Sequence, residues 1–139
     1  MAKPWSKLQR DIYKLLDTSI NLQIQCRAYR MPESISTNPQ IPRYWITLGK
    51  EIIFDIPKEA DLDVKYRLYE HIPAISQTIR DYINSPLEGL LSKTFDDKFG
   101  ITDILKAADR RLGKDALLLW STQASRNAGA YLILNKRFT

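Results

Sequence analysis

The stretch that decides the fold is residues 43–56, which read Arg43-Tyr44-Trp45-Ile46-Thr47-Leu48-Gly49-Lys50-Glu51-Ile52-Ile53-Phe54-Asp55-Ile56. Two short runs rich in β-branched and aromatic residues flank a Gly-Lys break. This pattern is typical of a β-hairpin with strands at about 43–48 and 51–56. Pro42 and Pro57 stand just outside the two ends. Both support the hairpin, because proline can end a strand there without removing a ladder hydrogen bond.

The apolar side chains of this hairpin allow two registers. If Ile46 lies opposite Phe54, one face collects Tyr44, Ile46, Leu48, Ile52, Phe54 and Ile56. If the loop differs by one residue, Trp45 joins Ile52 and Phe54 instead, because a one-residue slip exchanges the faces of a strand. Under either register the second face keeps some apolar side chains, such as Ile53 with Trp45 or with Ile46. We therefore expect helices to cover one face of the sheet and the other face to be only partly exposed to solvent.

Upstream of the hairpin, the hydrophobic period changes from that of a helix to that of a strand. Residues 5–16 predict an amphipathic helix, whose apolar residues at helical spacing are Trp5, Leu8, Ile12, Leu15 and Leu16. From Leu22 to Tyr29 apolar and polar residues alternate, which predicts a half-buried strand at about 22–29. Residues 31–42 contain three prolines and predict a loop.

Downstream of the hairpin, the pattern favours helices. Residues 61–72 fit both a strand and a helix, and their helical neighbourhood favours the helix. A firmer helix is predicted from Pro73, because one face collects Ile75, Ile79, Tyr82 and Ile83. The segment Ser85-Pro86-Leu87-Glu88 has the form of a capping box and predicts the start of another helix.

Three more helices are predicted towards the C-terminus. Thr102-Asp103 is expected to cap one that runs through Leu112 and stops at Gly113. Asp115 is expected to cap the next, in which residues 117–120 are apolar all round and are expected to be deeply buried. Residues 130–138 contain one β-branched residue among good helix formers, so a helix is favoured over a strand. An N-terminal helix, three antiparallel strands and a C-terminal run of helices together predict an α+β fold.

Size and composition indicate one domain, residues 1–139, because two would leave neither half much core. The net charge of +5 permits nucleic acid or an acidic protein as partner, without the dense basic loading of dedicated nucleic-acid binders. The single cysteine, Cys26, excludes an internal disulfide and fits a reducing cytoplasm. We expect neither a signal peptide nor a membrane-spanning segment, because no long apolar run occurs.

Several short pieces of the chain resemble a family of short, uncharacterised, enterobacterial-type hypothetical proteins. They are Trp5-Ser6-Lys7-Leu8, Tyr29-Arg30, Trp45-Ile46-Thr47, Gly49-Lys50-Glu51-Ile52 and Asp109-Arg110-Arg111-Leu112-Gly113-Lys114. The chain departs from the family at Leu48, where the family tends to have an aspartate before the glycine of the turn. The family has no established activity, so the resemblance supports the fold rather than a function.

The chemistry-bearing residues do not form a convincing catalytic set. His71 is the only histidine, so no histidine metal cluster is possible, and Cys26 lies on the apolar side of its strand, where packing is favoured. Asp55 with Asp63-Val64-Lys65 resembles a Mg²⁺-dependent nuclease site, but Asp96-Asp97-Lys98 repeats the same Asp-x-Lys pattern within 139 residues. We therefore expect no catalytic residues, no metal and no cofactor, and keep the nuclease as a remote alternative.

The most substantive feature is a basic and aromatic set on the polar side of the strands. We predict a binding surface made of Arg27, Tyr29, Arg30, Arg43 and Trp45, which belong to the residue types that anchor interfaces and stack on bases. Lys7, Arg10 and Lys14 border it if the first helix packs at the sheet edge. The competing interpretation is an ordinary solvated sheet face. Arg110-Arg111 with Lys114 is a second basic spot, for which we favour a structural role.

These residues favour a small non-catalytic bacterial interaction protein that binds a protein partner, with the immunity or toxin-neutralising type as one example. The alternative is an RNA- or DNA-binding module, with Arg27, Arg30 and Arg43 on phosphates and Tyr29 or Trp45 stacking on bases. The net charge of +5 speaks against one version of the first idea, because an immunity protein that faces a basic nuclease toxin is usually acidic.

Overall fold

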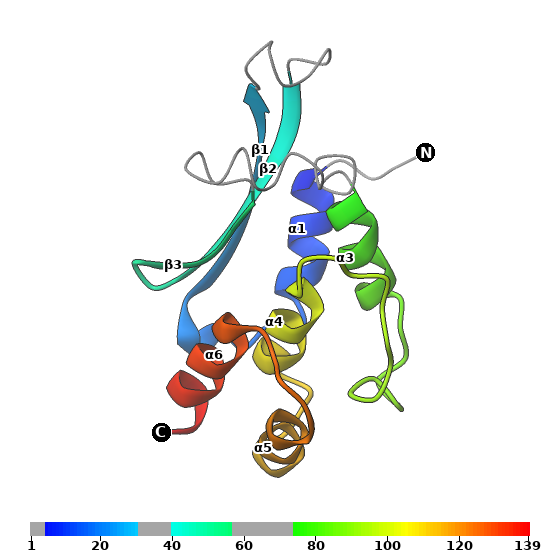
Figure 1. Cartoon of the computed structure of the whole chain (residues 1–139), viewed down its shortest axis with the longest axis vertical. Coiled ribbons are helices and arrows are strands. Elements are labelled where there is room, and N and C mark those ends of the chain that lie inside the picture. Colours follow the sequence, from blue (N-terminus) through cyan, green and yellow to red (C-terminus); the bar gives the residue numbers. More distant parts are fainter. Residues whose placement is uncertain (1–4, 31–39, 57–73) are drawn as a thin grey trace.

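The computed structural model describes residues 5–30, 40–56 and 74–139 (Figure 1). An N-terminal helix, α1 (Trp5–Tyr13), precedes three strands, β1 (Leu22–Arg30), β2 (Gln40–Leu48) and β3 (Glu51–Ile56). A short 3-10 helix, η1 (Thr18–Ile20), lies between α1 and β1, and four helices follow the sheet in the described chain: α3 (Ile75–Ile83), α4 (Ile101–Ala108), α5 (Lys114–Gln123) and α6 (Ala128–Phe138). The predicted α+β class is therefore confirmed. Within the described ranges no helix combines the length and the apolarity needed to cross a membrane.

The strands form one antiparallel sheet in the order β1-β2-β3. β2 begins at Gln40, so the end of the predicted 31–42 loop is strand, and Pro42 lies inside β2 opposite Ala28. The described pairs between β2 and β3 end at Tyr44, so Pro42 has a described strand neighbour on one side only. Proline is tolerated at such a position. The predictions for residues 31–39, Pro57, residues 61–72 and Pro73 fall outside the described residues.

The hairpin uses the first of the two registers, with a correction at one residue. Leu48 pairs with Glu51 across a two-residue turn, whereas Ile46 pairs with Phe54, so β3 carries one extra residue. This β-bulge restores the parity that brings Phe54 to the same face as Ile46. It also overturns the prediction for the two neighbouring isoleucines: Ile52 is 52% exposed, and Ile53 packs against the helical side near Gly129.

The turn of this hairpin explains why the departure at Leu48 is tolerated. Gly49 has a φ of +62°, and among the described residues Asn21 is the one non-glycine with a positive φ, so the φ of Lys50 is negative. That order of signs fits a type II′ turn, in which glycine takes the first central position. The Gly-Lys pair supplies this conformation without an Asp-Gly sequence.

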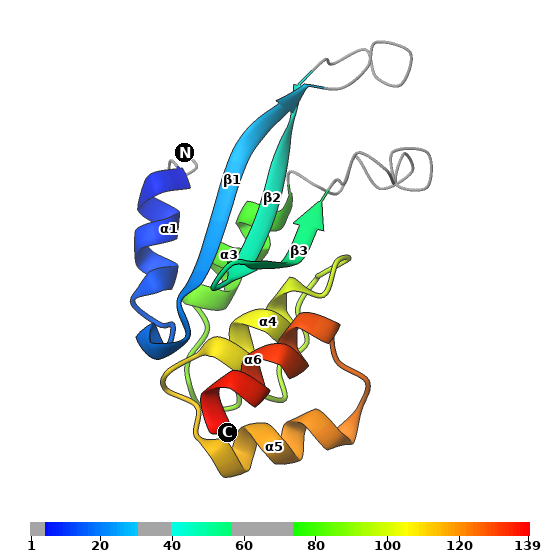
Figure 2. The ribbon, with the colours of Figure 1, turned by 90° about the vertical axis from the view of Figure 1, so that its left-hand side faces the viewer.

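The helices cover one face of the sheet and continue beyond its end. Figure 2 shows α1 beside β1, α3 behind the sheet, and α4 and α6 below it, with α5 outermost. Buried side chains from the sheet and the helices form one core, whose largest members include Tyr82, Leu8, Ile12, Ile24, Ile46, Ile79, Ile101 and Ile104. The predicted helices over residues 75–83 and 130–138 are confirmed.

Helix α1 ends earlier than predicted and closes the free edge of β1. It stops at Tyr13, and Leu16 instead forms an isolated β-bridge with Asp109. Ile24 donates its N–H to the Tyr13 hydroxyl at 2.9 Å, and its carbonyl accepts from Gln9 Nε2 at 2.7 Å. An edge strand normally exposes such groups to other chains. Two side chains of α1 thus satisfy the outer edge of β1 at this point.

The predicted capping box at Ser85 does not begin a helix, because the segment from 85 to 92 forms bends and turns. The Ser85 hydroxyl donates to the Asp81 carbonyl at 2.7 Å and accepts from Lys93 Nζ at 2.6 Å. Both interactions use the group that the capping box needs for its own backbone. The local pattern was therefore outweighed by tertiary contacts of Ser85.

The predicted N-terminal cap of α4, Thr102-Asp103, is wrong. The helix begins at Ile101, and the carboxylate of Asp97 accepts hydrogen bonds from the Thr102 N–H at 2.7 Å and the Thr102 hydroxyl at 2.8 Å. The helix ends at Ala108 and not at Gly113, which instead occupies the N-cap position of α5. Asp97 therefore does the capping that the sequence assigned to Thr102 and Asp103.

The prediction that residues 117–120 are all deeply buried is wrong. Leu117 and Trp120 are buried, whereas Leu119 is 62% exposed and Leu118 is also exposed. Because α5 is the outermost of the described helices, only one of its sides packs against the other described elements (Figure 2). A continuous apolar run is thus divided between the core and the surface.

Candidate binding surface on the sheet

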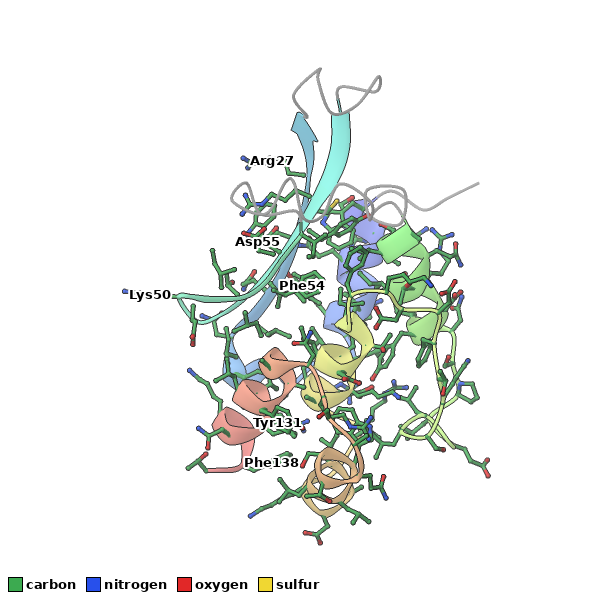
Figure 3. All side chains as sticks on the ribbon, in the orientation of Figure 1. Arg27, Lys50, Phe54, Asp55, Tyr131 and Phe138 are labelled. Atoms are coloured by element: carbon green, nitrogen blue, oxygen red, sulfur yellow. The ribbon has the colours of Figure 1, made fainter. Side chains whose placement is uncertain are left out.

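One row of side chains lies on the sheet face that the described helices do not cover. The row consists of Gln23, Gln25 and Arg27 in β1, Arg43, Trp45 and Thr47 in β2, and Asp55 in β3. Figure 3 shows Arg27 and Asp55 on this side of the sheet, whereas Phe54 points towards the helices. We call Arg27, Arg43, Trp45 and Asp55 the sheet-face cluster.

The sheet-face cluster is held together by stacking and by a forked ion pair. The guanidinium of Arg43 lies 4.6 Å from the centre of the Trp45 ring, and that of Arg27 lies 6.0 Å from it. Arg43 also donates from Nε and Nη2 to the two carboxylate oxygens of Asp55, each at 2.9 Å. This bidentate geometry fixes the plane of the Arg43 guanidinium and presents the tryptophan in one orientation.

The register settles the position of Trp45, which is half-buried on the outer face and is not part of the core beside Phe54. Arg27 is exposed, whereas the side chains of Arg43 and Asp55 are 33% and 12% exposed. The cluster therefore presents a cation at its β1 side and a neutralised Arg–Asp pair at its β3 side. The flat ring of Trp45 lies between them.

The structure brings together three of the five residues predicted for the binding surface, namely Arg27, Arg43 and Trp45. Tyr29 and Arg30 lie in β1, but their side chains fall outside the described part of the structure. Helix α1 does pack at the edge of the sheet, as the predicted border of Lys7, Arg10 and Lys14 requires, and these three side chains are exposed. Sequence reasoning did not include Asp55 in the surface, although it is the partner that orients Arg43.

The carboxylates considered for a nuclease site have other roles where they are described. Both oxygens of Asp55 accept from Arg43, and Asp97 caps α4. Asp63 and Lys65 fall outside the described residues. In the described ranges, no group of three or more histidine, cysteine, aspartate or glutamate side chains is arranged to hold a metal ion.

Cys26 occupies the packing position that the sequence indicated. Its side chain is partly buried and lies against the hydrophobic core. Burial raises the pKa of the thiol above its usual value, which disfavours the reactive thiolate. His71 lies outside the described residues.

A buried polar cluster around Asp109 accounts for the Asp-Arg-Arg segment. Asp109 is fully buried, and its carboxylate accepts from the Tyr82 hydroxyl at 2.7 Å and from Arg111 Nη2 at 2.7 Å. Burial and the neighbouring Asp109 carboxylate raise the pKa of Tyr82 well above its ordinary value. Arg110 donates to the carbonyl of Lys14 at 2.7 Å. The basic spot is thus a structural junction between the N-terminal and C-terminal helices.

One Ser–Lys pair has the distance of a catalytic dyad but not its chemistry. The 2.6 Å hydrogen bond between Lys93 Nζ and Ser85 Oγ was not predicted from the sequence. A nucleophilic serine must give its proton to a neutral base, whereas the Ser85 hydroxyl donates to the Asp81 carbonyl. Lys93 is also exposed to solvent. The pair is therefore a helix-end contact of α3.

An apolar groove lies on the opposite part of the molecule, between residues 87–92 and α5. Its cavity has a volume of about 350 Å³ and is lined by Leu87, Gly89, Leu90, Leu91, Ser92, Leu112, Ala116, Leu119, Trp120 and Gln123. Trp120 is 2% exposed, and its indole Nε1–H has no hydrogen-bond partner among the described residues. Sequence reasoning missed this groove, because it assigned residues 85–88 to a helix and residues 117–120 wholly to the core.

Comparison with known proteins places the sheet in a family. Residues 4–76 match the SF0329 protein family, a range that spans α1 and all three strands. The Asp109–Lys114 segment lies outside the matched range. No curated protein and no solved structure matches the chain. Because the match covers more than half of the 139 residues, the chain belongs to the SF0329 protein family, an uncharacterised family.

Proposed function

We propose that this chain is a small non-catalytic bacterial protein that binds a protein partner through the sheet-face cluster. The observation that carries the proposal is the stacking of Arg27 and Arg43 on Trp45, with Arg43 fixed by Asp55. Tryptophan and arginine are the residues that most often dominate the binding energy of interfaces. Ordering them before binding reduces the entropy that association costs.

A nucleic-acid role is less well supported by the same geometry. The two carboxylate bonds of Arg43 use the fork that would otherwise hold a phosphate, and guanidinium groups already lie over the Trp45 ring where a base would stack. A protein partner needs neither group to be released. Its expected chemistry is a carboxylate facing Arg27 and an apolar side chain against the exposed Ile52, beside Trp45.

Two further features belong to the proposal. We place the protein in the cytoplasm, where a free cysteine such as Cys26 is stable, and keep the immunity or toxin-neutralising type as one example. Tyr29 and Arg30 are proposed to extend the surface along β1.

The test is quantitative affinity purification with the tagged protein and two charge-matched variants. Arg27→Glu reverses the exposed cation of the cluster, and Lys114→Glu makes the same charge change at the exposed start of α5. We expect one protein to be recovered in stoichiometric amount with the wild type and with Lys114→Glu but not with Arg27→Glu. Equal recovery with both variants would refute the assigned surface.

The partner found in this way is then purified and its affinity measured by calorimetry. Trp45→Ala is expected to weaken binding about 30-fold, which corresponds to roughly 2 kcal/mol for a residue at the centre of an interface. Binding of generic RNA or DNA is measured in parallel at low and high salt. Salt-sensitive nucleic-acid binding that Arg27→Glu abolishes would support the alternative and contradict the proposal.

A further inference from the structure

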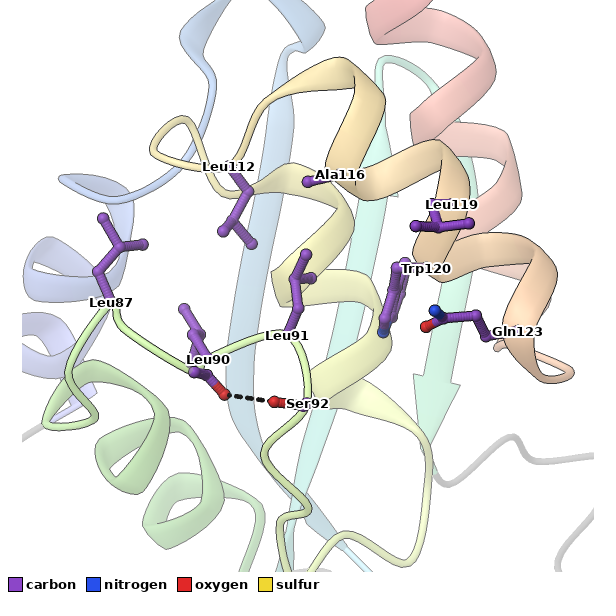
Figure 4. Close-up of a pocket in the computed structure, with 10 residues that line it drawn as sticks. Leu87, Leu90, Leu91, Ser92, Leu112, Ala116, Leu119, Trp120 and Gln123 are labelled. Atoms are coloured by element: carbon purple, nitrogen blue, oxygen red, sulfur yellow. Dashed lines mark hydrogen bonds between the residues drawn. The ribbon is translucent and has the colours of Figure 1, made fainter.

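We propose that the groove between residues 87–92 and α5 is a binding site for a small neutral organic molecule that is mainly apolar and carries one hydrogen-bond acceptor oxygen, as an aryl ketone does. Figure 4 shows the groove, with the 87–92 segment as one wall and α5 as the other. Nothing in the proposed protein–protein role uses this region. The two proposals therefore stand on different residues and are tested separately.

The walls of the groove define the apolar and neutral character of the ligand. Leucine side chains come from both sides, with Leu87, Leu90 and Leu91 on the turn segment and Leu119 on α5. None of the ten described lining residues carries a charge. The cavity volume of about 350 Å³ falls within the range of small-molecule sites. A charged ligand would lose its hydration there without gaining a partner of opposite charge among the described lining residues.

The acceptor oxygen is inferred from the indole of Trp120. Trp120 lines the groove and is 2% exposed, yet its Nε1–H has no partner among the described residues. Figure 4 draws this nitrogen on the edge of the ring that points down into the space bounded by Leu91, Ser92 and Gln123. Buried donors are nearly always paired, so an oxygen supplied by a ligand would complete this group. Because Nε1 is itself closed to solvent, the proposal requires a side chain at the rim, such as the exposed Gln123, to move as the oxygen enters.

Arg126 stacks on the indole of Trp120. The guanidinium of Arg126 lies 4.2 Å from the ring centre. Arg126 also donates from Nε and Nη2 to the Trp120 carbonyl, at 3.1 and 2.8 Å. The guanidinium is thus anchored on the backbone of Trp120 while it stacks on the indole of the same residue, which restricts the ring. The donor is thus positioned before a ligand arrives, as in sites that select by a single hydrogen bond.

The experiment follows the indole N–H resonances of the protein during titration with two probes of nearly equal shape. Acetophenone carries a carbonyl oxygen, and α-methylstyrene has a CH₂ group in its place. Loss of one resonance in Trp120→Phe identifies the Trp120 signal among the three tryptophans. We expect a saturable downfield shift of this signal with acetophenone and about tenfold weaker binding of α-methylstyrene, the loss of roughly one hydrogen bond.

Matched substitutions on α5 localise the site. Ala116→Phe fills the groove from an exposed position and is expected to abolish the shift, whereas Leu118→Phe adds a ring on the same helix outside the groove and is expected to leave it unchanged. Folding of each variant is checked by its circular dichroism spectrum. No saturable shift, equal binding of the two probes, or full binding by a folded Ala116→Phe variant would each overturn the proposal. Equal binding would indicate adventitious apolar adsorption only.

Discussion

Arg137 Nε donates to the carboxylate of Asp17 at 3.0 Å, although 120 positions separate the two residues. The same guanidinium donates to the carbonyls of Ala107 at 2.8 Å and Asp109 at 3.1 Å. One side chain of α6 therefore joins the segment between α1 and β1 to the end of α4. Because the side chain of Arg137 is 6% exposed, these bonds form away from water, where losing them is costly.

Arg137→Met is expected to destabilise the protein by about 3 kcal/mol, because the variant removes the buried guanidinium that donates to the Asp17 carboxylate and to the carbonyls of Ala107 and Asp109. Urea-induced unfolding measures the change. The control is Lys136→Met, which makes the same substitution at the preceding, exposed position and is expected to change stability by less than about 0.5 kcal/mol. Equal effects of the two variants would contradict the proposed junction.

In the Asp109 cluster we expect two substitutions to lower the free energy of unfolding by different amounts. Tyr82→Phe removes one hydrogen bond and is expected to cost about 1–1.5 kcal/mol. Asp109→Asn also removes the charge that faces Arg111, and is expected to cost about 3 kcal/mol or more. Both free energies of unfolding come from the same denaturant titration. A larger loss for Tyr82→Phe than for Asp109→Asn would show that the ion pair does not govern the cluster.

Tyr44 gives a prediction on pH. Burial raises its pKa to about 12, while its hydroxyl lies 2.6 Å from that of Ser76. An unfolded tyrosine ionises near pH 10, so the folded state keeps this proton longer. The stabilisation from Tyr44 is therefore fully present below about pH 10 and is lost as pH rises from about 10 towards 12. Ultraviolet titration of tyrosinate is expected to lose its latest resolved step in Tyr44→Phe; an unchanged titration curve would count against the assignment.

The β-bulge makes neighbouring isoleucines respond differently. Ile53→Ala is expected to cost about 2 kcal/mol, because this partly buried side chain packs near Gly129 and Ile104. Ile52→Ala is expected to cost less than about 0.5 kcal/mol, because Ile52 is largely exposed. Thermal or denaturant unfolding measures both. A hairpin that kept the Ile46–Phe54 pair without the bulge would reverse the order of the two losses, because Ile52 would then share the face of Phe54.

The sequence was sufficient for the hairpin but not for its bulge. Hydrophobic alternation brought Ile46 and Phe54 to one face, and the structure confirms that pairing. The alternation of apolar residues does not reveal the length of the turn. With the two-residue turn that the structure has, the Ile46–Phe54 pair requires one extra residue in β3. The position of Ile53 depends on its contact with Gly129, which lies far along the chain, so local pattern carries no information about it.

The predictions of several helix ends were wrong for a related reason. Ser85 has the sequence of a cap, but its hydroxyl bonds Asp81 and Lys93 instead. Asp97 caps α4 from outside the segment that the pattern identified. Both choices depend on which polar partners the folded chain brings near. In the candidate surface, residue type indicated Arg27, Arg43 and Trp45, but only the register showed that Asp55 orients Arg43.

The contacts of Gln9 and Tyr13 with Ile24 protect one point on the edge of the sheet from pairing with another strand. They occupy both hydrogen-bonding groups of a residue on the outer border of the sheet, where a strand from another molecule would otherwise add on. Helix α1 therefore covers this part of the edge strand. A cut between Tyr13 and Leu22 that releases α1 is expected to expose this strand edge to pairing with strands of other molecules.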